Sequence, residues 1–403
     1  MNPVILHDRA PPLARPFSQE EYDRRVSAVK YRMATEGVDV LLCADPANMN
    51  YLTGYDGWSF YVPQVVLVSL EHPTPIWIGR GMDASAARMT TFLADDDIIG
   101  YPDHYVQQRH IHPMNYVAEI ISGRGWGTLT IGVEMDAYFF SAMAWESLKA
   151  SLPNARFKDA ARMVNWVRAV KSETEIELIR RAGRIVEKVM DVAMQAIVPG
   201  RRQCDAVADI VHAQTSGTHE FGGDYTSIVP MLPSGPGTAT PHLTWSEAPY
   251  REGEATIIEI AGAHRRYHSP MARTLFLGDP PQKLVDTAAI VVEGLEAALE
   301  AARPGATCEE VEEAWRKTTQ RYGLVKESRI GYSTGCAYPP DWGEHTMSLR
   351  PGDTTVLQPN MVFHMIPGIW MDDWGIEISE TLVVTPQGGS PVANVKRGLF
   401  VKG

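Results

Sequence analysis

The 403-residue sequence contains few cysteines and no long apolar run. Its cysteines are far apart and form no C-x-x-C pair, which argues against a zinc knuckle, a redox motif or a disulfide framework. Apolar windows stay shorter than the roughly 18–20 residues that a membrane-spanning helix needs. The apolar run at the N-terminus is too short for a signal-peptide core, and an acid follows it. We therefore expect a cytoplasmic protein with no membrane association.

Basic charge is also scarce. The 37 lysines and arginines are outnumbered by 49 acidic residues, which gives a formal net charge of −12. Nucleic acids and anionic membranes favour basic surfaces, so neither is expected as a partner. The sequence also lacks a G-x-S-x-G elbow, a Walker loop, a G-x-G-x-x-G motif and an H-E-x-x-H motif. Serine-hydrolase and nucleotide-dependent chemistry are therefore unsupported, whereas a cationic substrate suits the charge.

The pattern of apolar residues predicts an α/β domain over residues 1–165. Residues 18–35 place apolar and aromatic side chains at helical spacing. Short apolar runs at Val38–Leu42 and Val65–Val68 have the length and composition of buried strands. Helical and strand patterns go on alternating through this part of the chain, as in α/β domains.

A second domain, residues 166–403, is predicted to be of the α+β class. It opens with a capping box, in which Ser172 caps a long amphipathic helix and Glu175 reaches back. Pro-Gly pairs at 199–200 and 304–305 each end a helix, and each is followed by a further helix and then strands. This faint repeat indicates two similar halves, and a site is expected where their sheets meet.

Two single residues are candidates for chemistry in the second domain. His242 follows a Gly- and Pro-rich loop, and a histidine held on such a loop suits proton transfer near neutral pH. The alternative is a surface histidine bonded to the backbone. Glu259 interrupts an apolar strand, where a carboxylate must be either paired or functional. It is therefore a functional acid or one half of an ion pair, for example with Arg273.

Two segments, 338–345 and 367–380, mix tryptophan with acidic residues. Aromatic faces beside carboxylates can hold a delocalised organic cation. The alternative places the tryptophans in the core and the acids on a solvated edge. Strand alternation predicts that Glu377 points away from its two isoleucine neighbours. The candidates for binding a cation are Asp341, Trp342, Trp370, Glu377 and Glu380.

From about Arg168 to Val384, the sequence resembles the pita-bread fold shared by methionine aminopeptidase, prolidase and creatinase. That resemblance places His242 on a histidine of the family. It also places five residues on the metal ligands of the metallopeptidases, namely Glu259, Pro270, Cys336, Ile366 and Ser379. Proline and isoleucine side chains offer no donor atom and serine is a poor ligand, so neither a metal nor another cofactor is expected.

Longer segments resemble the ectoine hydrolase family, including residues 45–61, 100–106, 241–245 and 338–344. The resemblance implies metal-independent opening of the cyclic amidine of ectoine to N-acetyl-L-2,4-diaminobutyrate, by a cytoplasmic homodimer whose product passes to a deacetylase. Glu259 would attack the amidine carbon or activate water, and His242 would shuttle the proton. Trp58 and Tyr55 would reach the substrate from the first domain.

Three alternatives stay open on the sequence. One is an Xaa-Pro metallopeptidase, which Pro270 and Ile366 disfavour because neither can bind a metal. A creatinase-type amidinohydrolase acting on a guanidino compound is the second. The third is a pseudo-peptidase that only binds a protein partner.

Overall fold

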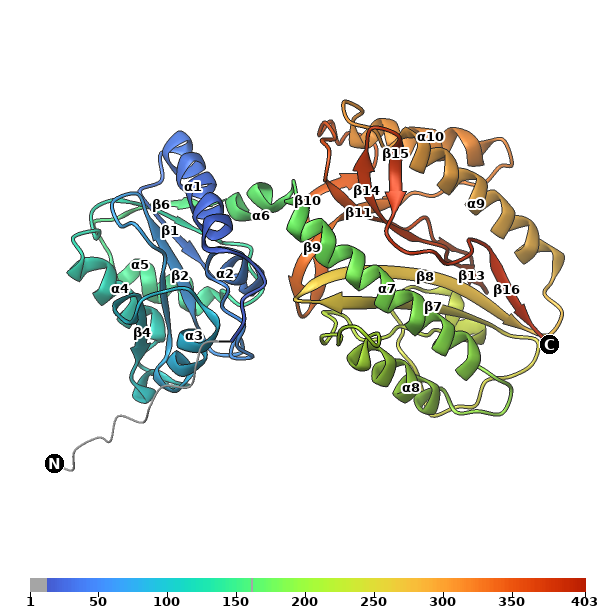
Figure 1. The fold of residues 1–403 in the computed structure, drawn as a ribbon, viewed down its shortest axis with the longest axis horizontal. Coiled ribbons are helices and arrows are strands. Elements are labelled where there is room, and N and C mark those ends of the chain that lie inside the picture. Colours follow the sequence, from blue (N-terminus) through green and yellow to red (C-terminus); the bar gives the residue numbers. More distant parts are fainter. Residues whose placement is uncertain (1–12, 161) are drawn as a thin grey trace. The chain divides into compact units, whose positions relative to one another are not determined.

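The chain divides into two compact units, Met1–Arg168 and Ala169–Gly403. Figure 1 shows the ribbon of the computed structural model, which describes residues 13–160 and 162–403. Each unit has its own sheet and its own covering helices. Within the described residues, we find no helix with the length and apolar character needed to span a bilayer.

The first unit is built on a six-stranded sheet in the order β4-β3-β2-β1-β5-β6. Neighbouring strands are parallel except that β2 is antiparallel to both β1 and β3. The strands are β1 (Val40–Cys43), β2 (Val65–Ser69), β3 (Ile76–Arg80), β4 (Ile98–Tyr101), β5 (Thr130–Val133) and β6 (Arg156–Asp159). The helices are α1 (Gln19–Glu36), α2 (Pro46–Thr53), α3 (Ala84–Thr90), α4 (Pro113–Gly123), α5 (Ala142–Ser151) and α6 (Met163–Arg168).

Successive residues of the central strands enter two different cores, because side chains alternate across a sheet. Leu41 and Val66 pack in one core with residues of α1, α2, α3 and α6. Leu42 and Leu67 pack in the other with residues of α4 and α5. Helices on both faces of the sheet confirm the α/β class predicted for this part of the chain.

The second unit contains an eight-stranded sheet, with the order β15-β14-β11-β9-β8-β16 and with β7 and β10 paired to β8 and β9. Its long strands are β7 (Ala255–His264), β8 (Tyr267–Leu277), β9 (Gly331–Tyr338) and β10 (Asp341–Leu349). The shorter ones are β11 (Val362–Met365), β14 (Glu380–Thr385), β15 (Gly388–Pro391) and β16 (Leu399–Lys402), and β12 (Ile369–Trp370) and β13 (Gly375–Ile376) form a separate pair.

Two helix pairs flank this sheet (Figure 1). The first pair is α7 (Glu173–Ala196) with α8 (Gln203–Ser216), and α7 packs on β7 and β8. The second pair is α9 (Gln282–Ala301) with α10 (Cys308–Gln320), which pack on β15 and β10 respectively. The predicted capping box at Ser172 is present, and Thr307 forms a second one, each with its glutamate three residues on. This arrangement agrees with the helix–helix–sheet repeat read from the sequence.

The two faces of β7 have different neighbours. Gly262 lies directly under α7, where a Cβ atom would stand only 2.1 Å from the carbonyl oxygen of Ala182. Glu259 and Ala261 point to the opposite face because residues two apart share a side of a strand. On that face Ala261 packs with Trp342 and Tyr332. Glu259 therefore faces the strands of the second half rather than the helix.

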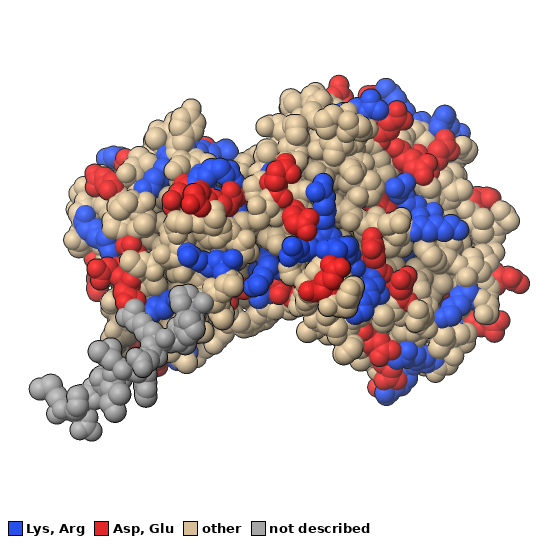
Figure 2. All heavy atoms as spheres, viewed as in Figure 1, with Lys and Arg blue, Asp and Glu red and all other residues tan. Residues whose placement is uncertain are grey.

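Acidic and basic side chains lie interspersed on each unit in the face drawn in Figure 2. Such mixing does not favour a polyanion on this face, because a nucleic-acid site needs clustered positive charge.

Candidate active site

Glu259 occupies the middle of the β-structure in the second unit. It pairs with Ala272 of β8 on one side and with Met231 on the other. Only 6% of the residue is exposed. Burial raises the pKa of the Glu259 carboxyl well above its ordinary value, and the nearby Glu377 raises it further. Among the described residues, no ion pair or side-chain hydrogen bond involves this carboxyl group, so it is available to a ligand.

A second buried carboxyl, Glu377, follows β13 and is 3% exposed. Its main chain is fixed by Thr274, whose Oγ1 accepts the Glu377 N–H at 2.9 Å and donates to the Glu377 carbonyl oxygen at 3.0 Å. Burial raises the pKa of Glu377 to about 7, against the lowering effect of the Lys326 ammonium. Of the two carboxyl groups at the site, Glu377 is therefore the one with a nearby cation.

Lys326 supplies that cation from the loop before β9. Its Nζ donates to the carbonyl oxygen of Gly368 at 2.7 Å and lies 4.6 Å from the centroid of the Trp370 ring. Burial lowers the pKa of Lys326 to about 8, while the charge of Glu377 raises it. Trp370 thus already has a cation over its face, as expected of an aromatic residue beside carboxylates.

A hydrogen-bonded chain adjoins Glu259 on the same side of the sheet. Trp342 Nε1 donates to the Tyr332 hydroxyl at 2.7 Å, and that hydroxyl is 2.9 Å from His364 Nδ1. His364 Nε2 lies 2.8 Å from Ser379 Oγ, which accepts the N–H of Ala272 at 2.6 Å. Ala272 is the cross-strand partner of Glu259, so the Ser379 end of the chain is anchored on the strand next to that carboxyl group.

His242 lies on an exposed turn after the short helix Gly235–Ala239. Its φ of 67° is left-handed, a conformation that costs a non-glycine residue free energy and is often found at functional positions. The loop holding it runs back along β7, because Met231 pairs with Glu259 and the N–H of Leu232 donates to the carbonyl oxygen of Thr244. Within the described residues, no hydrogen bond joins His242 to Glu259.

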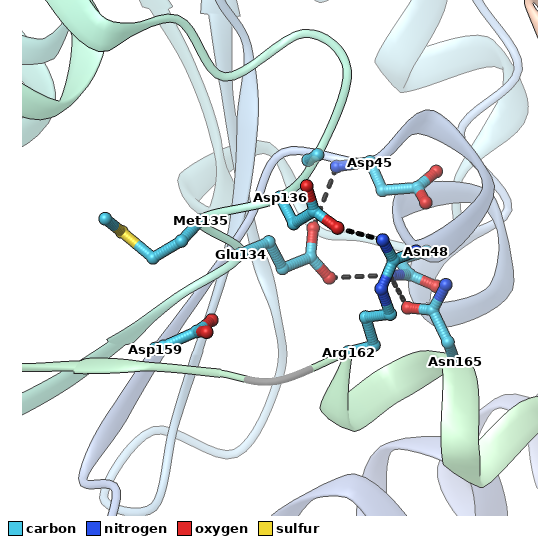
Figure 3. A pocket seen from close by; sticks show the side chains of 9 residues that line it. Asp45, Asn48, Glu134, Met135, Asp136, Asp159, Arg162 and Asn165 are labelled. Carbon is cyan, nitrogen blue, oxygen red and sulfur yellow. Dashed lines mark hydrogen bonds and ion pairs between the residues drawn. The ribbon is translucent and has the colours of Figure 1, made fainter. Parts of the chain in front are cut away.

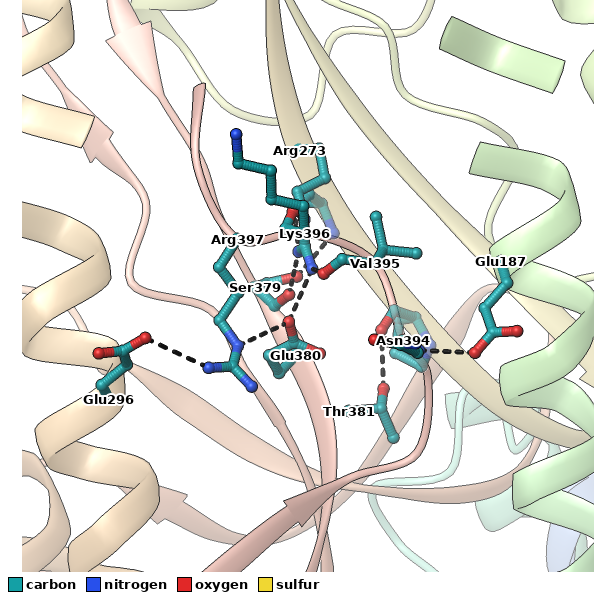
Figure 4. A network of polar contacts seen from close by, with 12 residues as sticks. Glu187, Arg273, Glu296, Ser379, Glu380, Thr381, Asn394, Val395, Lys396 and Arg397 are labelled. Atoms are coloured by element: carbon teal, nitrogen blue, oxygen red, sulfur yellow. Dashed lines mark hydrogen bonds and ion pairs between the residues drawn. The ribbon is translucent and has the colours of Figure 1, made fainter. Parts of the chain in front are cut away.

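Two of the predicted cation-binding acids have protein partners instead. Glu380 Oε1 lies 2.7 Å from Arg273 Nη2 and 3.2 Å from Arg397 Nε, as Figure 4 shows. The ion pair considered for Glu259 with Arg273 is therefore formed by Glu380. Asp341 lies 2.7 Å from His345 Nε2 and accepts the N–H of Gly343. Burial opposes these contacts, but they hold the pKa of Asp341 below its ordinary value.

The four predicted aromatic residues have different surroundings. Trp342 is 1% exposed and takes part in the chain through Tyr332, while the indole nitrogen of Trp370 is buried without a partner among the described residues. In the first unit, Tyr55 is buried, and its hydroxyl lies 2.5 Å from Ser59 Oγ. Trp58 is 56% exposed and packs on Phe60. A contribution of Tyr55 and Trp58 to the site stays a prediction.

The donor set does not fit the two-metal centre of the metallopeptidases. Pro270 and Ile366 carry no donor atom, and the Ser379 hydroxyl is occupied by Ala272 and His364. Over residues 13–160 and 162–403, no group of three or more histidine, cysteine, aspartate or glutamate side chains is arranged to hold a metal. A bridged pair of metal ions needs several carboxylate or imidazole ligands.

A cavity of about 180 Å³ in the first unit also contains carboxylates, as Figure 3 shows. Its buried member, Glu134, accepts the N–H groups of Ala44 and Asp45 at 2.7 and 2.8 Å and the side-chain amide of Asn48 at 2.6 Å. These donors stand at the start of α2, where a carboxylate is stabilised by unpaired N–H groups. Glu134 therefore fixes the start of a helix.

A second cavity, of about 330 Å³, lies in the other unit. Thr238 of the loop before His242, Gly375 of β13 and the exposed Lys283 line it. Glu259 does not line either of these two cavities. The best candidate for chemistry remains the group around Glu259, because its carboxyl has no fixed protein partner.

The sequence analysis missed three residues of this group. His364 interrupts an apolar strand just as Glu259 does, so the same reasoning would have found it. Tyr332 lies on β9 four residues before Cys336, where its polar character gives only a weak signal. Lys326 stands in a loop and has no distinguishing local pattern.

Comparison with known proteins identifies both parts of the chain. Residues 177–386 match the model of metallopeptidase family M24, and residues 25–170 match the creatinase/prolidase N-terminal domain. The chain is 48% identical over 394 residues to the ectoine hydrolase of Halomonas elongata, covering 96% of this chain and 98% of that protein.

Solved structures share the fold. The dipeptidase PepE of Mycobacterium ulcerans superposes with a TM-score of 0.79 at 23% identity, over 96% of this chain and 99% of that one. A prolidase of Thermococcus sibiricus superposes with a TM-score of 0.82 at 21% identity, over 95% and 100%. The predicted α/β domain followed by a pita-bread catalytic domain is thereby confirmed. The chain is a member of metallopeptidase family M24 with a creatinase/prolidase N-terminal domain, and ectoine hydrolase is among its relatives.

Proposed function

We propose that this protein opens the cyclic amidine of ectoine by hydrolysis, giving N-acetyl-L-2,4-diaminobutyrate, and that it does so without a metal ion. Support comes from the extensive identity to the ectoine hydrolase of Halomonas elongata. The observation that carries the proposal is the buried Glu259 carboxyl, which has no counter-ion of its own among the described residues and lies near a second carboxyl. Ectoine brings an amidinium, which is the cation that Glu259 lacks.

The raised pKa of Glu259 explains how the substrate would activate it. Burial favours the protonated form of the carboxyl in the ligand-free protein. A bound amidinium supplies positive charge in the same low-dielectric environment, which favours the ionised form and lowers the pKa again. The carboxylate is then produced only when its target is in place.

The route we favour needs two successive attacks on the amidine carbon, with a proton transfer at each. A Glu259 oxygen first bonds to the amidine carbon, and the ring C–N bond breaks as its nitrogen takes up a proton. Water then attacks the same carbon, the Glu259–carbon bond breaks and the carboxylate is restored. Proton transfer of this kind contributes about 10²–10⁴-fold to rate, and we assign the transfer from the attacking water to His242 on the exposed turn.

In the other route, Glu259 takes a proton from water, which attacks the amidine carbon directly. Mass spectrometry of protein quenched during turnover separates the two routes. Direct attack should give a peptide containing Glu259 that carries the mass of the ring-opened adduct, whereas activated water should give no such adduct.

Glu377 and the aromatic faces of Trp342 and Trp370 are proposed to hold the cation, with contributions of about 0.5–2 kcal/mol for each ring that it meets. Trp58 and Tyr55 are retained as predicted contacts from the first unit. Asp341 and Glu380 are assigned a structural role because of their partners His345 and Arg273.

A homodimer in the cytoplasm, and a deacetylase that takes the product, remain part of the proposal. Both rest on the resemblance to ectoine hydrolases. Sedimentation of the purified protein tests the dimer, and a monomer that is fully active would contradict it.

The central experiment is NMR of purified protein mixed with ectoine, with creatine and an Xaa-Pro dipeptide as competing substrates. Ring opening of ectoine is expected, and it should be lost in Glu259→Gln and in His242→Ala although both variants stay folded. Turnover of creatine or of the dipeptide would favour the amidinohydrolase or peptidase alternative. Binding without turnover of any of the three would favour a pseudo-peptidase.

A further inference from the structure

The chain of Trp342, Tyr332, His364 and Ser379 adjoins the site, and the mechanism above uses only one of its members, the ring of Trp342 that holds the cation. Tyr332 is half-buried, so part of its surface is open. It shares a face of the sheet with Ala261, two residues from Glu259. The negative charge of Glu259 is also among the causes that raise the pKa of Tyr332. The phenol therefore stands close to the carboxyl proposed to attack the substrate.

The hydrogen bonds of the chain direct the phenolic proton. Ser379 Oγ accepts the N–H of Ala272, and we assign its own proton to His364 Nε2, 2.8 Å away. The ring proton of His364 is then on Nδ1 and is donated to the Tyr332 oxygen. Trp342 Nε1, which can only donate, provides a second N–H to the same oxygen. With two donors pointing at it, the Tyr332 oxygen has its own proton free for a third group.

His364 cannot easily take a proton in this position. It is fully buried, and burial lowers the pKa of its imidazole to about 3. It therefore stays neutral at neutral pH, and its function is to hold the phenol in place. Two N–H donors also stabilise negative charge on the oxygen once the phenolic proton has gone.

We propose that Tyr332 is the proton donor to the departing ring nitrogen, and that His364 and Ser379 are positioning residues that act through it. As the C–N bond breaks, its electron pair moves to nitrogen, the Tyr332 O–H bond breaks and an N–H bond forms. Tyr332 is left as a phenolate between Trp342 and His364. Water then attacks the amidine carbon and releases Glu259, and a proton of this water passes to His242. His242 returns a proton to the Tyr332 phenolate through solvent. The net reaction therefore consumes the substrate and one water.

Direct attack by Glu259 makes the proton easier to give at the right moment. The carboxylate opposes loss of the phenolic proton while it is charged, since two adjacent negative groups repel. Once its oxygen is bonded to the amidine carbon, that charge is gone. The proton is thus retained before attack and released after it.

The inference depends on the proposed function, so the wild-type protein is tested with ectoine first. If it does not open ectoine, the proposed function itself fails. If it does, Tyr332→Phe removes one oxygen and leaves the ring, and kcat should fall by about 10²–10⁴-fold with KM changed less than about threefold. Tyr322→Phe is the matched control, because Tyr322 is an exposed tyrosine of the same unit whose hydroxyl bonds Glu293.

Positioning is tested by a double-mutant cycle. His364→Phe should lower kcat in the wild-type background and have little further effect in Tyr332→Phe, because its function runs through the phenol. Ser379→Ala, at the other end of the chain, should behave in the same way and serves if His364→Phe does not fold. The solvent deuterium isotope effect on kcat should change in both variants, which a purely structural role would not require.

Three results would overturn the inference while leaving the proposed function intact. The first is a wild-type kcat in Tyr332→Phe, and the second is a raised KM at unchanged kcat in that variant. The third is a loss of kcat from His364→Phe that is equal with and without the tyrosine hydroxyl.

Discussion

Replacing Glu377 by glutamine should make the ligand-free protein more stable at alkaline pH. Burial favours the protonated carboxyl, so the folded state binds this proton more tightly than the unfolded state does. The folded protein therefore loses stability as pH rises from the ordinary value of 4.5 to the folded pKa of about 7. Glutamine is neutral at every pH, so the variant does not lose this stability as pH rises.

The size of the effect follows from the displacement of the pKa. At about 1.36 kcal/mol for each pH unit, the rise of the Glu377 pKa from 4.5 to about 7 costs the folded state up to about 3 kcal/mol above pH 7. Glu377→Gln should recover most of this at pH 8 and about 1 kcal/mol or less at pH 5. In a unit of this size, 3 kcal/mol corresponds to a Tm higher by about 6–12 °C.

Glu380→Gln is the matched control, three residues away and equally buried. Although burial raises the pKa of Glu380, its carboxylate is the counter-ion of the fully buried Arg273. Leaving that guanidinium unpaired should cost about 3–5 kcal/mol, so this variant should melt at a lower temperature.

Thermal melts of both variants at pH 5 and pH 8 are the assay. A Tm gain that is the same at both pH values, or a lower Tm in Glu377→Gln, would refute the reasoning. If Glu377 also holds the substrate cation, the stabilised variant should show a KM for ectoine at least tenfold higher.

Two further predictions concern the charge and the metal content of the site. Lys326→Met removes the ammonium that lowers the pKa of Glu377, so this pKa should rise above about 7 and the acidic limb of the kcat/KM profile should move to higher pH. Lys283→Met is the control, because Lys283 is an exposed lysine 5.2 Å from the Trp374 ring, and it should leave the profile unchanged. Equal profiles for both variants would exclude the effect of Lys326 on Glu377. Dialysis against a chelator should leave kcat unchanged, and elemental analysis should find less than one metal ion per chain; reactivation by added Mn²⁺ or Zn²⁺ after chelation would contradict the metal-free proposal.

Local chemistry explains what the sequence predicts well. The capping boxes at Ser172 and Thr307 depend on residues three positions apart, so they can be read directly from the chain. Glu259 stands out because an acid within an apolar strand is costly wherever the strand packs. The resemblance to the pita-bread fold then predicts how these local features are arranged in one domain.

Contacts between distant segments explain what the sequence does not predict. Glu377 and Glu380 stand only three residues apart, yet only Glu380 meets Arg273, which lies 107 residues away in the chain. Pairing between β9 and β11 brings Tyr332 and His364 together, and no local pattern predicts this pairing.

The occupied hydroxyl of Ser379 has a consequence for how this chain could change over evolutionary time. To acquire the five-ligand set of the peptidases, it would need acids at positions 270, 366 and 379 together. Any one of them alone would add a negative charge beside Glu259 and Glu377, in an interior where an unpaired ion costs several kcal/mol. Ser379→Glu would in addition disconnect the N–H of Ala272 and the ring of His364. Single steps back toward a metal centre therefore pass through less stable proteins, and the present arrangement resists reversal.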